Sequence, residues 1–216
     1  MTYTVYEAMP LSQMLARVQK YYPGDGYKLV EKAYLFAQEA HKNQYRKSGE
    51  PYFTHPCFVA SILVELSLDP PTIAAGLLHD CAKCLPLSQM VKAAKDEKLD
   101  PVMKESKALM HAVAGMHLAQ DVYDVHDPEV LGAIRWHTTG HANMTRLEKI
   151  VYLADMIEPN RKPYPGLKAL RKLCMTDLDE AMHMALRMSL DHVREQGKPL
   201  HPDTMAALAE YEPELV

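Results

Sequence analysis

Apolar residues recur every three or four positions along most of this chain, which is the period of an α-helix with one buried face. Leu29, Ala33, Phe36 and Ala40, for example, fall on one side of a helix, and Pro23-Gly24 interrupts the pattern before them. The same reasoning predicts helices over about residues 11–22, 29–40, 56–66, 70–79, 86–98, 109–123, 128–136, 147–157 and 176–195. We therefore expect an all-α fold.

Length and composition favour a single helical bundle. A chain of 216 residues can form one sizeable domain around a single core, and no repeat or linker divides this one. Aromatic residues make up only 7%, whereas strand-rich proteins use more aromatic and β-branched side chains. We expect residues 1–216 to form one domain.

Charge and cysteine usage exclude several classes of protein. The formal net charge is −4, without the clustered basic surface of nucleic-acid-binding proteins. No signal-peptide pattern is visible, and no run approaches the roughly 20 apolar residues of a membrane span. Cys81 and Cys84 form a CxxC without the second pair that a zinc site needs. These features predict a cytoplasmic protein that binds neither nucleic acid nor membrane, and they are compatible with a homodimer.

Acidic and imidazole side chains occur inside segments that should be buried. His79-Asp80 directly follow the apolar run of residues 74–78, and Asp155 lies inside the apolar run of residues 150–157. A buried carboxylate is costly unless it is paired or bound to a metal. Three further histidines lie at expected helix ends or on apolar faces, where they could bind a metal: His55, His111 and His137.

Each of these positions also has an ordinary structural explanation. A lone histidine on an apolar helix is more often a hydrogen-bonded core residue than a ligand, and His55 could simply begin a helix before Pro56. The pair His126-Asp127 shows how weak a bare His-Asp signal is. Asp127 precedes Pro128 and suits a helix N-cap, so we do not count this pair as a site.

Residues 80–205 contain strings that are more specific than any single histidine. They include DCAK at residues 80–83, LMHAVAG at 109–115, AIRWHTTG at 133–140 and YLADMIEPNR at 152–161. On these strings the chain resembles the YqeK family of HD-domain hydrolases. His141 departs from that family's pattern, which usually has Arg or Lys at this position. The resemblance implies a metal-dependent phosphohydrolase with the ligands His55, His79, Asp80, His111, His137 and Asp155.

The same resemblance implies the roles of several side chains. Asp80 would bridge two divalent transition metal ions, with iron expected and manganese or zinc as alternatives. Lys83, one helical turn after His79, would act in catalysis and bind a substrate phosphate. Thr138 and Arg161 are further candidates for substrate binding, although Arg161 equally suits a helix cap or a salt bridge.

Upstream, residues 15–80 resemble a different branch of the superfamily, the RelA/SpoT hydrolase domain. The string QYRKSGEPY at residues 44–52, followed by His55-Pro56, carries this resemblance. In that family the loop contacts a guanosine nucleotide, which implies that Arg46 and Lys47 bind substrate. The two resemblances meet at the LLHD string of residues 77–80. A natural recombinant, an engineered chimera or an intermediate between the families would each give this pattern.

The two resemblances imply different substrates. The YqeK family implies symmetrical hydrolysis of diadenosine tetraphosphate to two ADP, and the RelA/SpoT family implies (p)ppGpp 3'-pyrophosphohydrolase activity. RelA/SpoT hydrolases follow the His-Asp pair with a Glu-Asp pair needed for catalysis. Here residues 81–86 contain no carboxylate, and Lys83 lies among them. We therefore favour diadenosine tetraphosphate.

Two further hypotheses remain beside these. Another nucleotide phosphatase activity is one, because HD sites accept varied substrates. A non-catalytic nucleotide-binding protein is the other, although the six intact ligand positions argue against it.

Overall fold

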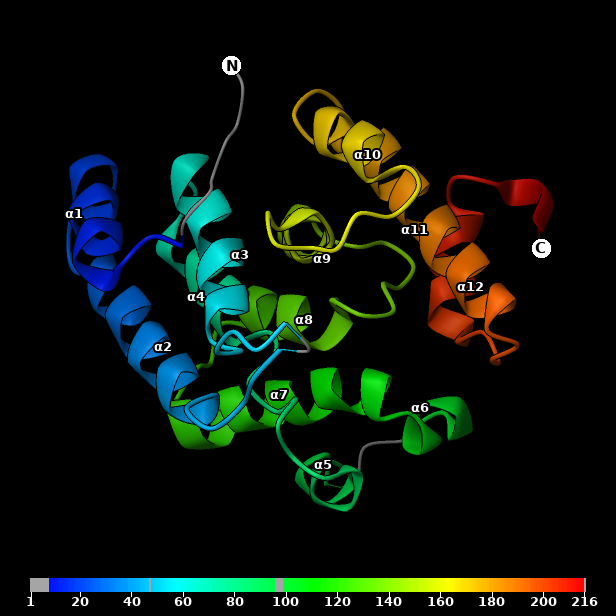
Figure 1. Cartoon of the computed structure of the whole chain (residues 1–216), viewed down its shortest axis with the longest axis horizontal. Coiled ribbons are helices and arrows are strands. Elements are labelled where there is room, and N and C mark those ends of the chain that lie inside the picture. The colour runs from blue at the N-terminus through cyan, green and yellow to red at the C-terminus, as the bar shows by residue number, and fades with distance from the viewer. Residues whose placement is uncertain (1–7, 47, 96–98, 216) are drawn as a thin grey trace.

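The computed structural model describes residues 8–46, 48–95 and 99–215, and within these ranges it contains helices and loops but no strand (Figure 1). The helices are α1 (Leu11–Tyr21), α2 (Gly26–Ala40), α3 (Thr54–Glu65), α4 (Pro70–Leu78), α5 (Leu87–Ala93), α6 (Pro101–Glu105), α7 (Lys107–Tyr123), α8 (Pro128–Trp136), α9 (Arg146–Ile157), α10 (Leu167–Leu173), α11 (Leu178–Glu195), α12 (Pro202–Ala209) and the 3-10 turn η1 (Pro213–Leu215). The predicted all-α fold class is confirmed.

Local sequence explains where several of these helices begin. The Asp69 side chain accepts a hydrogen bond from the Thr72 N–H, and Asp127 caps α8 in the same way, each followed by a proline in the first turn. Thr145 and Glu148 form a reciprocal capping box at the start of α9. The interpretation of Asp127 as an N-cap is therefore correct.

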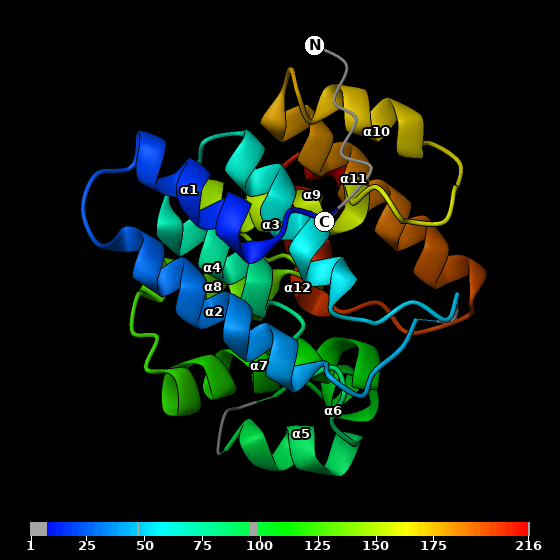
Figure 2. The ribbon, with the colours of Figure 1, turned by 60° about the vertical axis from the view of Figure 1, so that its left-hand side comes forward.

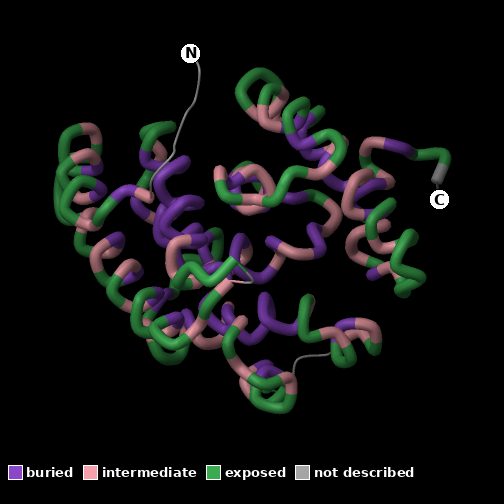
Figure 3. The backbone as a smooth tube through the Cα atoms, in the orientation of Figure 1, coloured by how far each residue is buried: buried purple, intermediate pink, exposed green. Residues whose placement is uncertain are grey.

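The helices are arranged around a buried centre formed by α3, α4, α8 and α9. Helices α1 and α2 cover one side of α3 and α4, and Figure 2 shows this layer in front of them. Helix α7 packs against α8 below the centre, and α10 to α12 lie beyond α9 on the far side from α1 (Figure 1). Helices α3 and α4 are buried on almost every face, as the continuous buried stretches of Figure 3 show. His55, near the start of α3, and His79, just after α4, are thereby buried.

The buried apolar residues form three clusters in the described part of the chain. The largest joins α1–α4 to α7–α9, a second lies between α9 and α10–α12, and a third lies between α5, α6 and α7. In place of one expected core there are three clusters, because α5–α6 bury an apolar face against α7 and α10–α12 bury another against α9. That residues 1–216 form one domain stays a prediction.

Three helices were not predicted from the sequence. Helices α6 and α10 are too short, at five and seven residues, to show a clear helical period. Pro163, Pro165 and Gly166 suggested only a loop, but Gly166 adopts the positive φ of 87° and is the N-cap of α10. Helix α12, of eight residues, begins after His201 with Pro202 in its first turn.

Two boundaries also differ from the prediction. Helix α3 begins at Thr54, which places His55 inside its first turn. Helix α5 ends at Ala93, and the end of the helix predicted there, residues 96–98, lies outside the described residues. No helix in the described ranges has both the length and the apolarity needed to cross a membrane.

Candidate metal and phosphate site

The central aspartate and its neighbouring histidine lie at the end of α4. His79 and Asp80 are fully buried, and His79 Nδ1 donates a 2.7 Å hydrogen bond to the Gly76 carbonyl oxygen. Gly76 is also where α3 and α4 touch, because a Cβ atom there would lie 2.5 Å from Leu63 Cδ1. The close approach of the helices brings the start of α3 beside the end of α4.

On one side of Asp80, donors from three helices converge. His55 from α3 places its Nε2 atom 3.3 Å from Asp80 Oδ2, 3.0 Å from Asp155 Oδ1 of α9 and 3.3 Å from His79 Nε2. His79 Nε2 is in turn 3.5 Å from Asp80 Oδ2 and 3.8 Å from Asp155 Oδ1. Two imidazoles and two carboxylates therefore surround one point.

On the other side, the second oxygen of Asp80 faces two more imidazoles. His111 Nε2 of α7 lies 2.9 Å from Asp80 Oδ1, and His137 Nε2, just after α8, lies 3.6 Å from it. The two Nε2 atoms are 3.0 Å apart, and His137 Nδ1 donates to the Ile134 carbonyl oxygen at 2.7 Å. Asp80 thus presents one oxygen to each set of donors, which is the arrangement of a carboxylate that bridges two cations.

The donor set fits metal binding on chemical grounds. Because Nδ1 of His79 and of His137 donates to a backbone carbonyl, the neutral imidazole has its lone pair on Nε2, facing the other donors. These lone pairs meet carboxylate oxygens and other imidazole nitrogens, a contact that is repulsive unless a cation or a proton lies between them. His55, His79 and Asp80 form one group close enough to hold an ion, and Asp80, His111 and His137 form another.

The pKa values of the two histidines in the first set are shifted in opposite directions. Burial lowers the pKa of His79 to about 3, so this imidazole is neutral at physiological pH. Burial also lowers the pKa of His55, but Asp155, Asp80 and Glu158 outweigh it and raise the pKa to about 10. Burial would raise the pKa of Asp80, yet the Lys83 ammonium and the surrounding imidazoles hold it well below its ordinary value. The protonated His55 imidazole thus supplies positive charge among these three carboxylates.

The same carboxylate is bound by two side chains from outside the ligand sets. Lys83 Nζ lies 3.0 Å from Asp80 Oδ2, and its side chain is 35% exposed, while its predicted contact with a substrate phosphate stays a prediction. The Tyr52 hydroxyl donates a 2.6 Å hydrogen bond to the same oxygen. Tyr52 was not predicted as a site residue, although it belongs to the string that resembles RelA/SpoT.

Both predicted arginines are engaged by acidic residues of the α9 end. Arg161 Nη2 lies 2.6 Å from Asp155 Oδ1, so the salt-bridge interpretation of Arg161 describes the structure. Arg46 Nη2 donates to Glu158 Oε1 at 2.7 Å, while its Nη1 is buried without a hydrogen-bond partner among the described residues. Glu158, fully buried and 3.5 Å from His55 Nδ1, was missed. Its position just after an apolar helix, like that of Asp155 within one, is the signal that could have found it.

Thr138 and Lys47 are the two remaining predicted substrate contacts. The Thr138 Oγ1 atom is buried and makes no hydrogen bond within the described residues, although the Thr138 backbone directly follows His137. Lys47 lies outside the described residues.

Comparison with known proteins gives the class of protein. Residues 52–160 match the family model described as the HD domain. The symmetrical bis(5'-nucleosyl)-tetraphosphatase of Bacillus subtilis is 38% identical over 131 residues, covering 60% of this chain and 70% of that protein. The bifunctional (p)ppGpp synthase/hydrolase SpoT of Escherichia coli is 51% identical over 69 residues, which is 32% of this chain and 10% of SpoT.

A solved structure resembles nearly the whole fold. It is a crystal structure of a predicted HD superfamily hydrolase involved in NAD metabolism from Clostridium acetobutylicum. The two chains superpose with a TM-score of 0.65 at 28% identity, covering 95% of this chain and 98% of the other.

This chain belongs to the HD-domain family. The predicted class, an HD-domain phosphohydrolase, is therefore confirmed, and so is the resemblance of the chain to two branches of that family.

Proposed function

We propose that the chain hydrolyses dinucleoside tetraphosphates symmetrically, converting diadenosine tetraphosphate to two ADP. The observation that carries this proposal is the contact of Lys83 with Asp80 at 3.0 Å. The Lys83 ammonium thus lies beside the Asp80 carboxylate, in the stretch where the (p)ppGpp alternative requires an acidic pair. The likeness to the tetraphosphatase of Bacillus subtilis over 60% of the chain supports the same substrate.

We propose that two metal ions bind here, one to His55, His79 and Asp155, the other to His111 and His137, with Asp80 shared between them. When bound, such a pair supplies Lewis acidity toward phosphate oxygens and lowers the pKa of a bound water molecule. Iron is the expected metal, and manganese or zinc are alternatives.

The protein's own side chains would position the substrate. Lys83 is partly exposed and can offer its ammonium to a phosphate oxygen while it stays beside Asp80. The unpaired Thr138 hydroxyl and Arg46 Nη1 are further donors. Arg161 would act mainly through Asp155, whose pKa is held well below its ordinary value, against the effect of burial, by Arg161 and His55. Lys47 stays a proposed substrate contact on sequence grounds alone.

The decisive experiment compares the two substrates directly. The metal-loaded protein is incubated separately with diadenosine tetraphosphate and with ppGpp, and the products are resolved by ion-exchange chromatography. We expect ADP as the sole product from the first and no pyrophosphate from the second. Release of pyrophosphate from ppGpp, with diadenosine tetraphosphate left intact, would reverse the assignment.

A variant tests the contact that carries the proposal. Lys83→Ala should lower the rate of diadenosine tetraphosphate hydrolysis about a hundredfold, the loss typical of one charge-stabilising donor. Lys92→Ala, which removes an exposed lysine from α5, is the matched control. Unchanged turnover in Lys83→Ala would remove this lysine from the site.

We also propose a cytoplasmic location. All four cysteines are free thiols, two of them buried, which suits a reducing compartment. The homodimer stays a prediction.

A further inference from the structure

An open pocket of about 510 Å³ lies next to the metal and phosphate site. Lys83 belongs to both, because its ammonium contacts Asp80 while its side chain lines the pocket. The other lining residues come from the end of α2, the loop after it, the turn after α4 and the first residue of α7. They are Glu39, Ala40, Lys42, Asn43, Gln44, Cys84 and Lys107.

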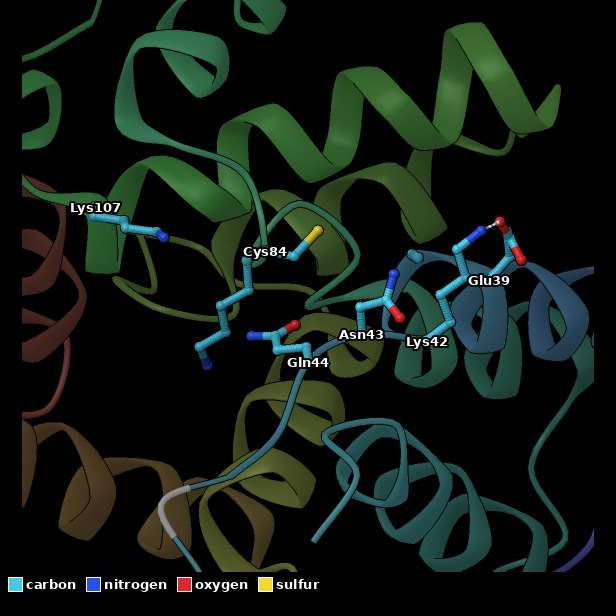
Figure 4. A pocket seen from close by; sticks show the side chains of 8 residues that line it. Glu39, Lys42, Asn43, Gln44, Cys84 and Lys107 are labelled. Atoms are coloured by element: carbon cyan, nitrogen blue, oxygen red, sulfur yellow. Dashed lines mark hydrogen bonds and ion pairs between the residues drawn. The ribbon is translucent and has the colours of Figure 1, made fainter. Parts of the chain in front are cut away.

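The pocket presents hydrogen-bond donors beside apolar surface. In Figure 4, Lys107 and Gln44 extend from opposite sides toward the space between them, whereas Lys42 turns toward Glu39, with which it forms an ion pair. Gln44 is held in place, because its Oε1 accepts a 2.7 Å hydrogen bond from Nδ1 of the buried His41. The Gln44 amide N–H₂ group is thereby left to donate into the pocket.

The pocket contains a cation, Lys107, that no acidic residue in the described part of the chain neutralises. Lys107 forms no ion pair with any residue that the structure describes, and it lies near Cys84. Burial raises the pKa of Cys84, and the Lys107 ammonium opposes this shift by favouring the thiolate. Lys83, which contacts Asp80, thus shares the pocket with the Gln44 amide and with Lys107. Donors and cations of this kind bind phosphate oxygens.

We propose that this pocket is a second phosphate subsite, which binds a nucleoside diphosphate, the half of the substrate that lies away from the metal ligands. The proposal rests on the proposed function, since a tetraphosphate cut at its centre leaves two anionic phosphates on each side of the broken bond. One pair would lie at the metal ligands. The other would extend past Lys83 to the Gln44 amide and to Lys107.

A kinetic comparison separates this subsite from general electrostatic attraction. Lys107→Gln removes a cation from the pocket, and Lys104→Gln removes the same charge from an exposed position on α6 that does not line the pocket. For diadenosine tetraphosphate we expect KM to rise about tenfold in Lys107→Gln, the loss of one charged hydrogen bond, and to stay unchanged in Lys104→Gln. Hydrolysis of p-nitrophenyl phosphate, which cannot reach the pocket, should be equal in both. Equal KM values for diadenosine tetraphosphate in the two variants would overturn the proposal.

A labelling experiment tests the subsite without turnover. Cys84 is exposed in the pocket, Cys57 and Cys81 are buried, and the remaining thiol is removed by Cys174→Ser. In the metal-loaded protein, ADP should slow the reaction of Cys84 with N-ethylmaleimide about fivefold or more, and Lys107→Gln should abolish this protection. ADP that leaves the labelling rate unchanged, or that protects Cys84 equally in Lys107→Gln, would refute the subsite.

The two experiments keep this proposal apart from the proposed function. If the protein does not cleave diadenosine tetraphosphate but ADP protects Cys84 through Lys107, the substrate assignment is wrong and the subsite stands. If the protein cleaves diadenosine tetraphosphate to ADP but neither the KM nor the labelling depends on Lys107, the subsite is wrong and the function stands.

Discussion

The Arg46 guanidinium donates a 2.7 Å hydrogen bond to the carboxylate of Glu158, a residue 112 positions further along the chain. Glu158 is fully buried, and the oxygen that binds Arg46 also lies 3.5 Å from Nδ1 of His55. Its other oxygen accepts a 2.7 Å hydrogen bond from the Asn160 N–H. The contact therefore links the loop after α2 to the end of α9. Through Glu158 it also supports Nδ1 of His55, a candidate metal ligand. It also joins the two segments that resemble different families.

Glu158→Gln should weaken both the fold and the metal site. The amide cannot balance the Arg46 charge, which is only 17% exposed, so we expect unfolding free energy to fall by about 1–3 kcal/mol in urea denaturation. The neutral amide also no longer attracts His55 electrostatically, so metal affinity measured by titration should fall about tenfold. Glu50→Gln, at an exposed position of the same loop, is the control. A Glu158→Gln protein that matches Glu50→Gln in both measurements would show that Glu158 has no supporting role.

The two donor sets predict a characteristic metal stoichiometry. Metal analysis should find about two ions per chain in the wild-type protein. His137→Ala removes a donor from one set alone and should retain about one ion, whereas Asp80→Asn weakens both sets and should lose most of both. His126→Ala changes an exposed histidine and should keep both ions. A chelator that strips the wild-type protein should abolish hydrolysis, and readdition of metal should restore it.

The results that would contradict this assignment are equally specific. Two ions in His137→Ala would show that His137 is not a ligand. A wild-type protein that contains no metal after aerobic and anaerobic purification would refute the whole ligand set.

Much of the fold and of the site is predictable from the sequence, because local signals mark them. Most helices show a clear 3.6-residue period, and Asp80 and Asp155 are charges inside apolar runs, which is visible without any tertiary information. The structure brings all six predicted ligands together. Whether they bind metal stays a prediction.

The parts that were missed depend on contacts between distant segments. Tyr52 has no distinctive local pattern, and Glu158 is marked only by its position just after an apolar helix. The roles of both arise when the loop after α2 meets α4 and α9. Helix α10 was missed for the opposite reason, since the local signals of Pro165 and Gly166 resemble a loop and its burial against α11 decides the structure. Tertiary packing of this kind leaves little trace in a single sequence.

The hydrogen bond from Tyr52 to Asp80 predicts a role in positioning this carboxylate, which we propose to be shared by two metal ions. Tyr52→Phe removes the hydroxyl that donates to Oδ2 at 2.6 Å and keeps the ring, so the fold should remain and metal affinity should fall about tenfold. Tyr45→Phe, whose side chain is largely exposed, should leave metal affinity unchanged. The measurement is a metal titration of each purified protein. Equal affinities in the two variants would mean that Asp80 is held adequately by its own backbone and by Lys83.

His41 predicts part of the acid sensitivity of the fold. This residue is buried, and burial lowers its pKa below the ordinary value of 6.5, while the hydrogen bond to Gln44 opposes the shift. In the unfolded chain the imidazole binds a proton near pH 6.5, which the folded protein resists. Its contribution to stability is therefore fully present above pH 6.5 and is lost as the pH falls below that value.

The His41→Gln variant, which cannot titrate there, should lose less stability than the wild-type protein between pH 7 and pH 5. The difference should approach at most about 1.4 kcal/mol per pH unit below pH 6.5, the linkage slope of one proton. Urea denaturation of both proteins with the same metal content isolates this residue, because the histidines proposed as metal ligands are common to both. His126→Gln, in which solvent reaches the replaced side chain, should follow the wild-type pH dependence. If His41→Gln follows it too, His41 accepts its proton within the fold, and the buried contact with Gln44 tolerates the charge.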